Sequence, residues 1–389
     1  MTMMKKTTIL MAGCSLYLSF VAVQTGAEDD IKPANHISWN RCLSMKPEFY
    51  GSDEAIRIAD NVLLYQRKTA GWPKGVDMAR VLSQEDKAEL RNDQDKNDST
   101  LDNGATHTQM RYLARVYNAT KLKRVKKGFL KGVDYLLKAQ YPDGGWPQFY
   151  PSQGNAGYSR YITFNDNAMI GAMSILRDIA KRKPGYAFVD EKRRKNAEKA
   201  VQKGIECILK CQIIVDGKRT AWCQQHDETT LEPRPARTYE KVSICSEESV
   251  GIVKFLMGLD APESDVIEAV QSAVAWFDRA KLTGIRQVRK PDQSKERGYD
   301  KVIVEDAAAP PIWARFYEIG TNRPIFCGRD GIVKYRMSEI EHERRVNYSW
   351  YGYWPAELLD EDYPLWRNKW GPKNPMLKTQ GCKTKQIRE

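Results

Sequence analysis

The sequence predicts an all-α fold of repeated helical hairpins, with long irregular loops and few short strands. A helix-like run that ends in glutamine recurs three times, at intervals of about seventy-five residues. Each run is followed by a tryptophan turn, and a new apolar run with helical periodicity begins after each turn. A repeat of this length is typical of stacked architectures, in which each unit buries its apolar face against its neighbours.

The three repeats also share a polar segment just before the next helix begins. The glutamines are Gln66, Gln140 and Gln212, the tryptophan turns are 71–74, 144–148 and 222–226, and the polar segments are 102–106, 165–169 and 243–249. Asp, Asn and Ser are favoured there as helix caps, because their side chains accept hydrogen bonds from the first free amides. Repeat symmetry would instead gather these side chains at one end of the assembly, where carboxylates could meet a cation. Capping is the simpler interpretation for any single segment, and both roles stay open.

The individual elements follow from periodicity and from helix starts. The segment 52–54 reads as the start of a helix whose apolar residues share one face. The best strand signal is 301–304, and it follows a charged stretch, 286–297, that we expect to be a solvated loop. Further helical patterns cover 106–119, 125–140, 166–182, 191–214, 247–259, 264–280 and 306–319.

The N-terminus reads as a secretory signal peptide. Lys5 and Lys6 precede an apolar or small run that ends near Ala27, where we predict cleavage. A lipoprotein signal with a lipidated Cys14 is the weaker alternative, because only a short apolar stretch precedes that cysteine. We therefore expect a secreted or periplasmic protein. Its predicted parts are a signal peptide, 1–27, an irregular lead-in, 28–50, a single main domain, 51–370, and a basic tail, 371–389.

Composition narrows the choice of partners. Of the 389 residues, 29% are charged and 41% are hydrophobic, which is typical of a soluble globular chain, and no later segment is apolar long enough to span a bilayer. Removal of 1–27 lowers the formal net charge from +12 to +10. An exported protein this basic favours an acidic polymer outside the cell over nucleic acid, although simple solubility explains the charge equally well.

The cysteines favour buried thiols over a metal site. Seven remain after cleavage, and this odd number leaves at least one free thiol or an intermolecular bond in an oxidising compartment. Cys207 and Cys211 lie four residues apart on a predicted helix, but a zinc site would need tight pairs such as CxxC. We therefore expect no zinc. A pairing such as Cys42 with Cys382 stays open.

Six motifs occur in an order that resembles the family 10 pectate lyases. They are Gly71–Lys74, Leu101–Thr106, Gly144–Pro151, Ile162–Met169, Pro235–Arg237 and Arg329–Gly331. The resemblance runs from about residue 50 to residue 358 and includes Tyr348–Gly352 and Trp354–Pro355. It implies an (α/α)3 toroid that cleaves polygalacturonate by calcium-dependent β-elimination. The main domain, 51–370, would then be the catalytic domain.

The chemistry of elimination gives these residues roles. The enzyme must remove the weakly acidic C5 proton next to the uronate carboxylate and expel the O4 oxygen. A divalent cation on that carboxylate would stabilise the negative charge that develops as the proton leaves. Calcium prefers hard oxygen ligands, and the resemblance places it near Asp102, Asn103 and Asp166. The ion could be shared between protein and substrate.

The resemblance points to an arginine as the base, and we assign this role to Arg329. A guanidinium has a pKa of about 12.5–13.8, so deprotonation at neutral pH costs on the order of 8 kcal/mol. A calcium ion and neighbouring cations would lower that pKa. The alternative is that Arg329 only grips a carboxylate while another group takes the proton.

Three further residues are candidates for substrate binding. Arg237 matches a family position and would clamp a carboxylate with its planar fork. Lys74 would act as a point charge in the groove, or it is a solvated surface lysine. Trp146 could face a sugar ring, although the repeat spacing already explains it as packing. A triad around His226 is discounted, because no Gly-x-Ser-x-Gly elbow occurs.

Two positions depart from the pattern of the family. Gly104 follows Asp102 and Asn103 where relatives commonly have an acid, and Cys245 stands where a small residue is expected. Either change could weaken calcium binding or activity.

The leading prediction is therefore a secreted pectate lyase that gives 4,5-unsaturated products, binds neither nucleic acid nor membrane after signal cleavage, and is treated as a monomer. One alternative is a hydrolase of acidic or unsaturated sugars that uses Asp102 and Asp166 as acid and base. Another is an inactive pectin-binding protein, against which the joint presence of Arg329, Asp166 and Arg237 argues.

Overall fold

The structure is a computed structural model that describes residues 37–152 and 157–371. The predicted signal peptide, Cys14, Cys382 and nearly all of the basic tail lie outside these residues. Among the described residues, no helix is both long enough and apolar enough to cross a membrane. The six described cysteines are buried and free, and Cys207 and Cys211 approach each other to 4.0 Å between sulfur atoms.

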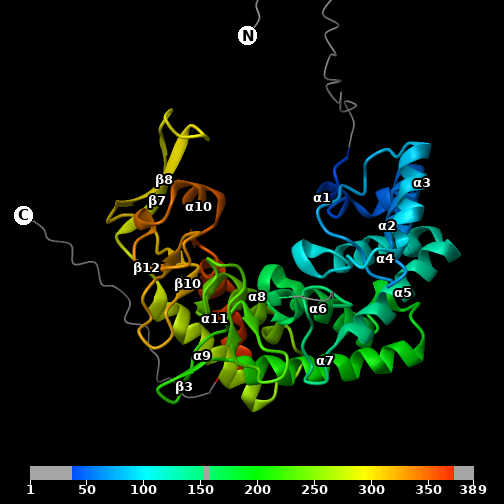
Figure 1. Cartoon of the computed structure of the whole chain (residues 1–389). Helices are drawn as coiled ribbons and strands as arrows, with labels where there is room; N and C mark the ends of the chain where they lie inside the picture. The colour runs from blue at the N-terminus through cyan, green and yellow to red at the C-terminus, as the bar shows by residue number, and fades with distance from the viewer. Residues whose placement is uncertain (1–36, 153–156, 372–389) are drawn as a thin grey trace, which may run out of the picture. The chain divides into compact units, whose positions relative to one another are not determined.

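The described chain is predominantly helical, as predicted, and its longer helices form hairpins (Figure 1). Helix α4 packs against α5, α6 against α7, and α8 against α9. The helices are α1 (Trp39–Cys42), α2 (Asp53–Tyr65), α3 (Gln84–Asn92), α4 (His107–Thr120), α5 (Lys123–Ala139), α6 (Ala168–Ala180), α7 (Glu191–Cys211), α8 (Ser246–Met257), α9 (Ser264–Ala280), α10 (His342–Asn347) and α11 (Tyr363–Trp370).

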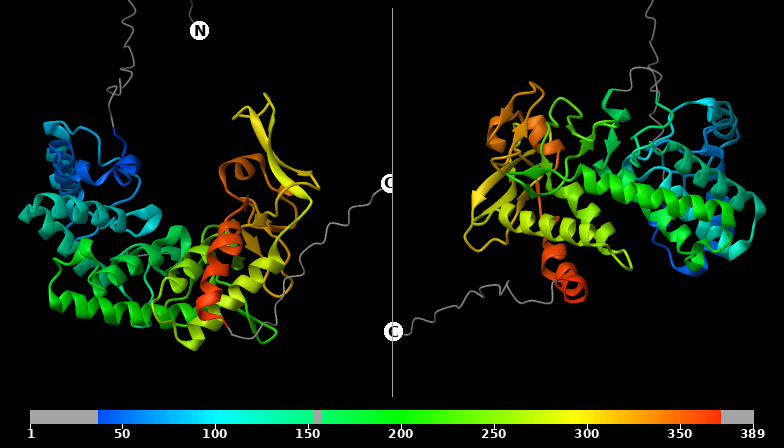
Figure 2. Two further views of the ribbon diagram at one scale, coloured as in Figure 1. Left: turned by 180° about the vertical axis from the view of Figure 1, so that it is seen from behind. Right: turned by 90° about the horizontal axis from the view of Figure 1, so that it is seen from below.

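The hairpins stack so that like helices touch. A first row runs through α4, α6 and α8, and a second row runs through α2, α5, α7 and α9 (Figure 2). Helix α4 begins just after a polar segment singled out in the sequence, and α6 and α8 begin within the other two. The starts of these helices therefore lie at the same end of neighbouring hairpins.

Each repeat glutamine follows the last residue of a second-row helix and bridges to the next helix of that row. Its Nε2 atom donates one hydrogen bond within its own turn and one to a helix carbonyl, which has a second lone pair to offer. Gln66 donates to Ala70 (2.9 Å) and Gly128 (3.0 Å), Gln140 to Gly144 (2.9 Å) and Ala200 (2.8 Å), and Gln212 to Thr220 (2.9 Å) and Ala269 (2.9 Å). The three bridges thus connect α2 to α5, α5 to α7, and α7 to α9.

The tryptophans of the turns are fully buried and close the ends of the same helices. Each indole N–H donates to the carbonyl four residues before the glutamine: Trp72 to Val62 (2.7 Å), Trp146 to Leu136 (2.8 Å) and Trp222 to Ile208 (2.7 Å). A fourth tryptophan, Trp313, makes the equivalent bond to Phe277 at the end of α9 (2.8 Å). The sequence spacing missed it because a long hairpin is inserted between α9 and this turn.

The strands are short and antiparallel, and those of the described residues are two residues long except β7 and β8. They form the sheets β1-β4-β5, β2-β3, β6-β10, β7-β8, β9-β13 and β11-β12. Their bounds are β1 (Ile162–Thr163), β2 (Ile214–Val215), β3 (Lys218–Arg219), β4 (Gln225–His226), β5 (Pro233–Arg234), β6 (Ile244–Cys245), β7 (Ile285–Pro291), β8 (Tyr299–Glu305), β9 (Trp313–Ala314), β10 (Phe316–Tyr317), β11 (Phe326–Cys327), β12 (Val333–Lys334) and β13 (Tyr351–Gly352).

Three local predictions differ from the structure. The helix predicted over 306–319 is wrong, since β9 and β10 occupy this segment and Pro310 and Pro311 cannot donate helix hydrogen bonds. The charged stretch 286–297 is not simply a loop, because its first half belongs to β7. The lead-in contains α1 and a 3-10 turn, Pro47–Gly51. The strand signal 301–304 lies within β8, as predicted.

Candidate active site

Two polar segments of the repeats meet at one end of the first row. Asp102–Gly104 and Asn165–Asn167 form short 3-10 turns that contact each other, and the second turn also contacts α8. Asn103, Asp166 and Asn167 have φ angles of 49°, 51° and 56°, in the left-handed region that residues with a Cβ seldom adopt. Such strained backbone is concentrated at functional sites.

The aspartates of these turns do not cap helices. Thr106 and Asn167 occupy the N-cap positions of α4 and α6, and neither makes a capping hydrogen bond through its side chain. Cys245 occupies the same position before α8, again without a cap bond. The capping interpretation of the polar segments therefore does not hold at Asp102 or Asp166, and both carboxylates are available for another role.

Asp102 is buried, and only one of its two carboxylate oxygens has a partner. Its Oδ2 atom pairs with the ammonium of Lys74, while Oδ1 is buried with no hydrogen-bond partner among the described residues. A buried carboxylate oxygen without a partner is costly, so it would gain from any cation that reaches it. The ion pair brings the ammonium of Lys74 to the site, while 40% of the Lys74 side chain stays exposed.

Asp166 lies close enough to Asp102 for the two charges to interact. One side of Asp166 faces solvent, and its Oδ2 accepts a hydrogen bond from the Asn165 amide at 2.9 Å. Burial of its other side, followed by the charges of Asp102 and Glu248, raises the pKa of Asp166 to about 6. The convergence of Asp102 and Asp166 that repeat symmetry suggested is thus present, and the two carboxylates repel each other.

A cluster of charged side chains at the start of α8 adds residues to which no role in the site was assigned from the sequence. The buried carboxylate of Glu248 contacts the Arg315 guanidinium and the Cys245 thiol, and Arg315 also pairs with Glu247 at 2.8 Å. Burial, with the charge of Glu248, raises the pKa of Glu247 to about 7. Burial opposes the charge of Arg315, but Glu248 and the other acidic groups around it together outweigh burial, so the pKa of Arg315 lies well above its usual value.

The signals for this cluster were present in the sequence but weak. Glu247 and Glu248 lie in the third polar segment, where they read as the acidic first turn of a helix. Arg315 follows the fourth tryptophan, which the regular spacing did not reveal. Asn165 connects the cluster to Asp166, since its Oδ1 accepts from Gln224 at 2.5 Å and from Arg315 at 3.4 Å.

The two departures from the family pattern have local structural reasons. Gly104 has φ of 76°, and a Cβ there would lie 3.2 Å from Thr108 Cγ2, so the turn itself favours glycine. Cys245 donates its thiol hydrogen to Glu248. The thiol therefore belongs to the acidic end of the site, which comprises Asp102, Asp166, Glu247 and Glu248.

A second cluster gathers three arginines around Tyr239. The guanidinium groups of Arg237, Arg329 and Arg344 lie 4.9, 5.7 and 4.6 Å from the centre of its ring. Arg237 is gripped by Glu240 through two hydrogen bonds of 2.8 and 2.5 Å, and this carboxylate raises the pKa of Arg237. The cluster offers several donors to an anion.

Tyr348 connects the two clusters. Its ring lies 4.9 Å from the Arg315 guanidinium and 5.8 Å from that of Arg237, and its hydroxyl donates to Glu240 at 2.7 Å. Arg329 is more peripheral, since 63% of its side chain is exposed and it pairs with Glu343 at 3.2 Å. Of the two arginines proposed from the sequence, Arg237 has the shorter connection to the acidic end.

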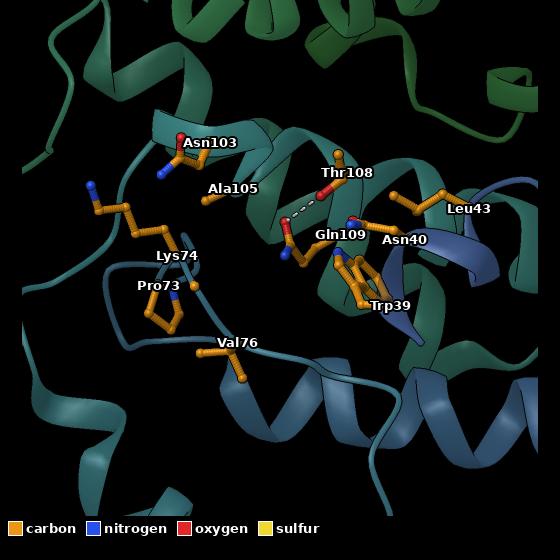
Figure 3. Close-up of a pocket in the computed structure, with 11 residues that line it drawn as sticks. Trp39, Asn40, Leu43, Pro73, Lys74, Val76, Asn103, Ala105, Thr108 and Gln109 are labelled. Carbon is orange, nitrogen blue, oxygen red and sulfur yellow. Dashed lines mark hydrogen bonds between the residues drawn. The ribbon is translucent and has the colours of Figure 1, made fainter. Parts of the chain in front are cut away.

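The remaining predicted residues are placed as follows. Lys74 and Asn103 line a cavity of about 60 Å³, together with Trp39 and Gln109 (Figure 3). Trp146 is fully buried and bonded to α5, so neither face of its ring is open to a sugar and it acts as a packing residue. His226 is also buried, and both of its ring nitrogens make hydrogen bonds to the backbone.

The oxygen donors of the acidic end fit a hard cation. Among residues 37–152 and 157–371, no group of three or more His, Cys, Asp or Glu side chains is arranged to hold a metal ion by itself. The unpartnered Oδ1 of Asp102 and the mutual repulsion of Asp102 and Asp166 are nevertheless features that a bound cation would relieve. Carboxylate and amide oxygens are ligands that suit calcium.

Comparison with known proteins identifies the family. The family model for pectic acid lyase matches residues 66–359. The chain belongs to this family. A family 10 polysaccharide lyase from Cellvibrio cellulosa is similar in structure, with 32% sequence identity, a TM-score of 0.69, and coverage of 84% of this chain and 94% of that chain. A comparison with curated proteins finds no match.

A second solved structure is a mutant of the Cellvibrio lyase in complex with trigalacturonic acid. It has 32% identity and a TM-score of 0.69, and the match covers 86% of this chain and 96% of that chain. The chain is therefore a polysaccharide lyase, and its fold is the (α/α)3 toroid predicted from the sequence.

Replacing Asp166 by Asn is expected to stabilise the lyase at alkaline pH. Folding raises the pKa of Asp166 from 3.8 to about 6, so between these values the folded state binds more protons than the unfolded state. The contribution of this group to stability therefore falls as the pH rises from about 4 to about 6. At pH 8 the thermal midpoint of Asp166→Asn should exceed that of the parent by roughly 1–2 °C.

This gain should shrink as the pH is lowered toward 4, where Asp166 is already protonated in the folded protein. Thermal unfolding followed by circular dichroism at several pH values measures both effects. A lower midpoint for the variant at pH 8 would show that the two carboxylates do not repel each other in the folded state.

Proposed function

We propose that this lyase is a secreted pectate lyase that cleaves polygalacturonate by calcium-dependent β-elimination and leaves 4,5-unsaturated oligogalacturonates. The observation that carries the proposal is the meeting of Asp102 and Asp166 beside arginines that the chain contributes from later segments. An acidic end suits a cation, and a basic end suits uronate carboxylates. The similarity to a lyase solved with trigalacturonic acid supports this choice of substrate.

Asp102, Asn103 and Asp166 would hold the calcium ion. When bound, calcium supplies electrophilic stabilisation of the charge that develops next to the uronate carboxylate. Lys74 neutralises Asp102 at Oδ2 and leaves Oδ1 free. Protonated Asp166 is a poor ligand, so cation binding should weaken as the pH falls below about 6.

Arg237 would bind a substrate carboxylate through its planar fork, while Glu240 and the rings of Tyr239 and Tyr348 hold its guanidinium in position. We propose that a neutral Arg329 takes the C5 proton at one of its terminal nitrogens. Its guanidinium pairs with Glu343 at 3.2 Å, so Arg329 must leave this carboxylate before it can reach the C5 proton.

Export rests on the predicted signal peptide, 1–27. The mature chain would then carry a formal charge of +10, which favours association with a polyanion such as polygalacturonate. Its acidic substrate lies outside the cell, so secretion and activity agree.

The proposal predicts a specific product. Incubation of the purified lyase with polygalacturonate and calcium should give a rising near-ultraviolet absorbance from the 4,5-unsaturated ends, and a calcium chelator should abolish it. Hydrolysis would release reducing ends without this absorbance and would favour a hydrolase. Absorbance that persists after chelation would remove the metal role from Asp102, Asn103 and Asp166.

Lysine replacements separate the roles of the two arginines, because lysine keeps the charge but changes geometry and proton affinity. Arg329→Lys should lower kcat by at least ~100-fold with little change in KM, as expected for loss of a base. Arg237→Lys should mainly raise KM. If Arg237→Lys instead lowers kcat and Arg329→Lys raises KM, Arg237 is the base and Arg329 binds the carboxylate. The contact of Arg237 with Tyr348 is compatible with this exchange.

A further inference from the structure

The β7–β8 hairpin extends away from the helices (Figure 1), and its first strand overlaps the stretch 286–297 that the sequence predicts to be a solvated loop. Its strands pair antiparallel over seven residues each, from the pair Ile285 and Glu305 to the pair Pro291 and Tyr299. Neither catalysis nor the repeat architecture requires an arm of this kind. Its side chains therefore need another explanation.

Three cations on this hairpin lie close to one another without a carboxylate. Arg289 and Lys301 are directly opposite in the strand register, where like charges are destabilising. Arg297 precedes β8 and is exposed, as is Arg289. Among the described residues, none of the three has a carboxylate within ion-pair distance, whereas Arg286 on the same strand pairs with Asp306 at 3.0 Å.

The acidic residue nearest to these cations in the register, Asp300, is already engaged. Asp300, which neighbours Lys301 and lies opposite Lys290, makes two hydrogen bonds of 3.0 and 2.5 Å to Arg345 on α10. The guanidinium of Arg289 lies 5.0 Å from the centre of the Tyr299 ring. The Arg289 guanidinium is thus held in place, and none of the three positive charges has a carboxylate within ion-pair distance among the described residues.

Lys301 connects these charges to the active site. Its ammonium donates to the backbone carbonyl of Tyr348 at 3.0 Å, and the Tyr348 ring contacts both Arg315 and Arg237. Burial, followed by the charges of Arg289 and Arg297, lowers the pKa of Lys301. The repulsion among the three side chains would be relieved by an anion next to the cleavage site.

We propose that Arg289, Arg297 and Lys301 form a second binding site for uronate carboxylates, which holds a part of the polygalacturonate chain that extends beyond the active site. The choice of ligand rests on the proposed function. A polymer in the cleavage site carries a carboxylate on every sugar, so a segment that passes Tyr348 brings anions to the hairpin. The site would increase affinity for long chains and leave the chemical step unchanged.

The test compares a long and a short substrate with one double variant and one matched control. Arg289→Gln/Arg297→Gln removes two unpaired cations, and Lys301 is kept because it is half-buried against Tyr348. The variant should raise KM for polygalacturonate roughly five-fold, from two exposed charge contacts of ordinary strength, and leave kcat unchanged. Its kcat/KM for trigalacturonate should equal that of the parent.

Arg286→Gln is the control, since it removes a cation that already has a carboxylate partner on the same hairpin. It should leave KM for both substrates unchanged. The KM of the double variant for polymer should also depend less on salt than that of the parent. Thermal unfolding of all three proteins checks that the hairpin variants remain folded.

Two results would overturn the proposal: an unchanged KM of the double variant for polymer, or an equal loss on trigalacturonate and polymer. Failure of the proposed function looks different, because the parent would then give no unsaturated product from either substrate. In that case, gel retardation by embedded polygalacturonate still tests the site. Equal retardation of the parent and the double variant would reject it.

Discussion

Each repeat glutamine donates two hydrogen bonds from one amide nitrogen, and the rest of the structure depends on this interaction. A single amide nitrogen, as in Gln66, joins the turn that ends one second-row helix to the middle of the next. Three such bridges hold the helices of that row at a fixed spacing, while the tryptophan beside each bridge closes the helix end. First-row helices then begin side by side, which brings the Asp102 and Asp166 turns into contact.

The contact between the Asp102 and Asp166 turns destabilises the folded state, and the structure shows the features responsible. Asp102 keeps an unpartnered oxygen, Asp166 has a raised pKa, and neighbouring residues adopt left-handed backbone angles. Lys74 offsets part of the negative charge at Asp102, and Arg315 offsets part of it at Glu248. The remaining repulsion is what a cation and an anionic substrate would relieve together, so stability and the proposed function are opposed at these two aspartates.

The sequence predicted those parts that follow from periodicity and local chemistry. The helices of both rows, the glutamine and tryptophan turns and the meeting of Asp102 with Asp166 all follow from a regular repeat. Arg315 and the fourth tryptophan escaped prediction because an inserted hairpin displaces them from that repeat. Tyr348 could not be assigned its connecting role, since it contacts Glu240 and Arg237, which precede it by more than a hundred positions. Trp146 illustrates the opposite limit, because burial rather than residue type decides whether an indole can meet a sugar.

The calcium-induced shift of the thermal midpoint in Gln66→Ala tests the central claim most directly. Calcium that binds only the folded protein should raise the midpoint of the parent and of Gln202→Ala, an exposed control on α7, by equal amounts. Gln66→Ala should unfold at a lower temperature and respond less to calcium, because the Asp102 and Asp166 turns are no longer held together. An undiminished calcium response in Gln66→Ala, or none in the parent, would contradict the account.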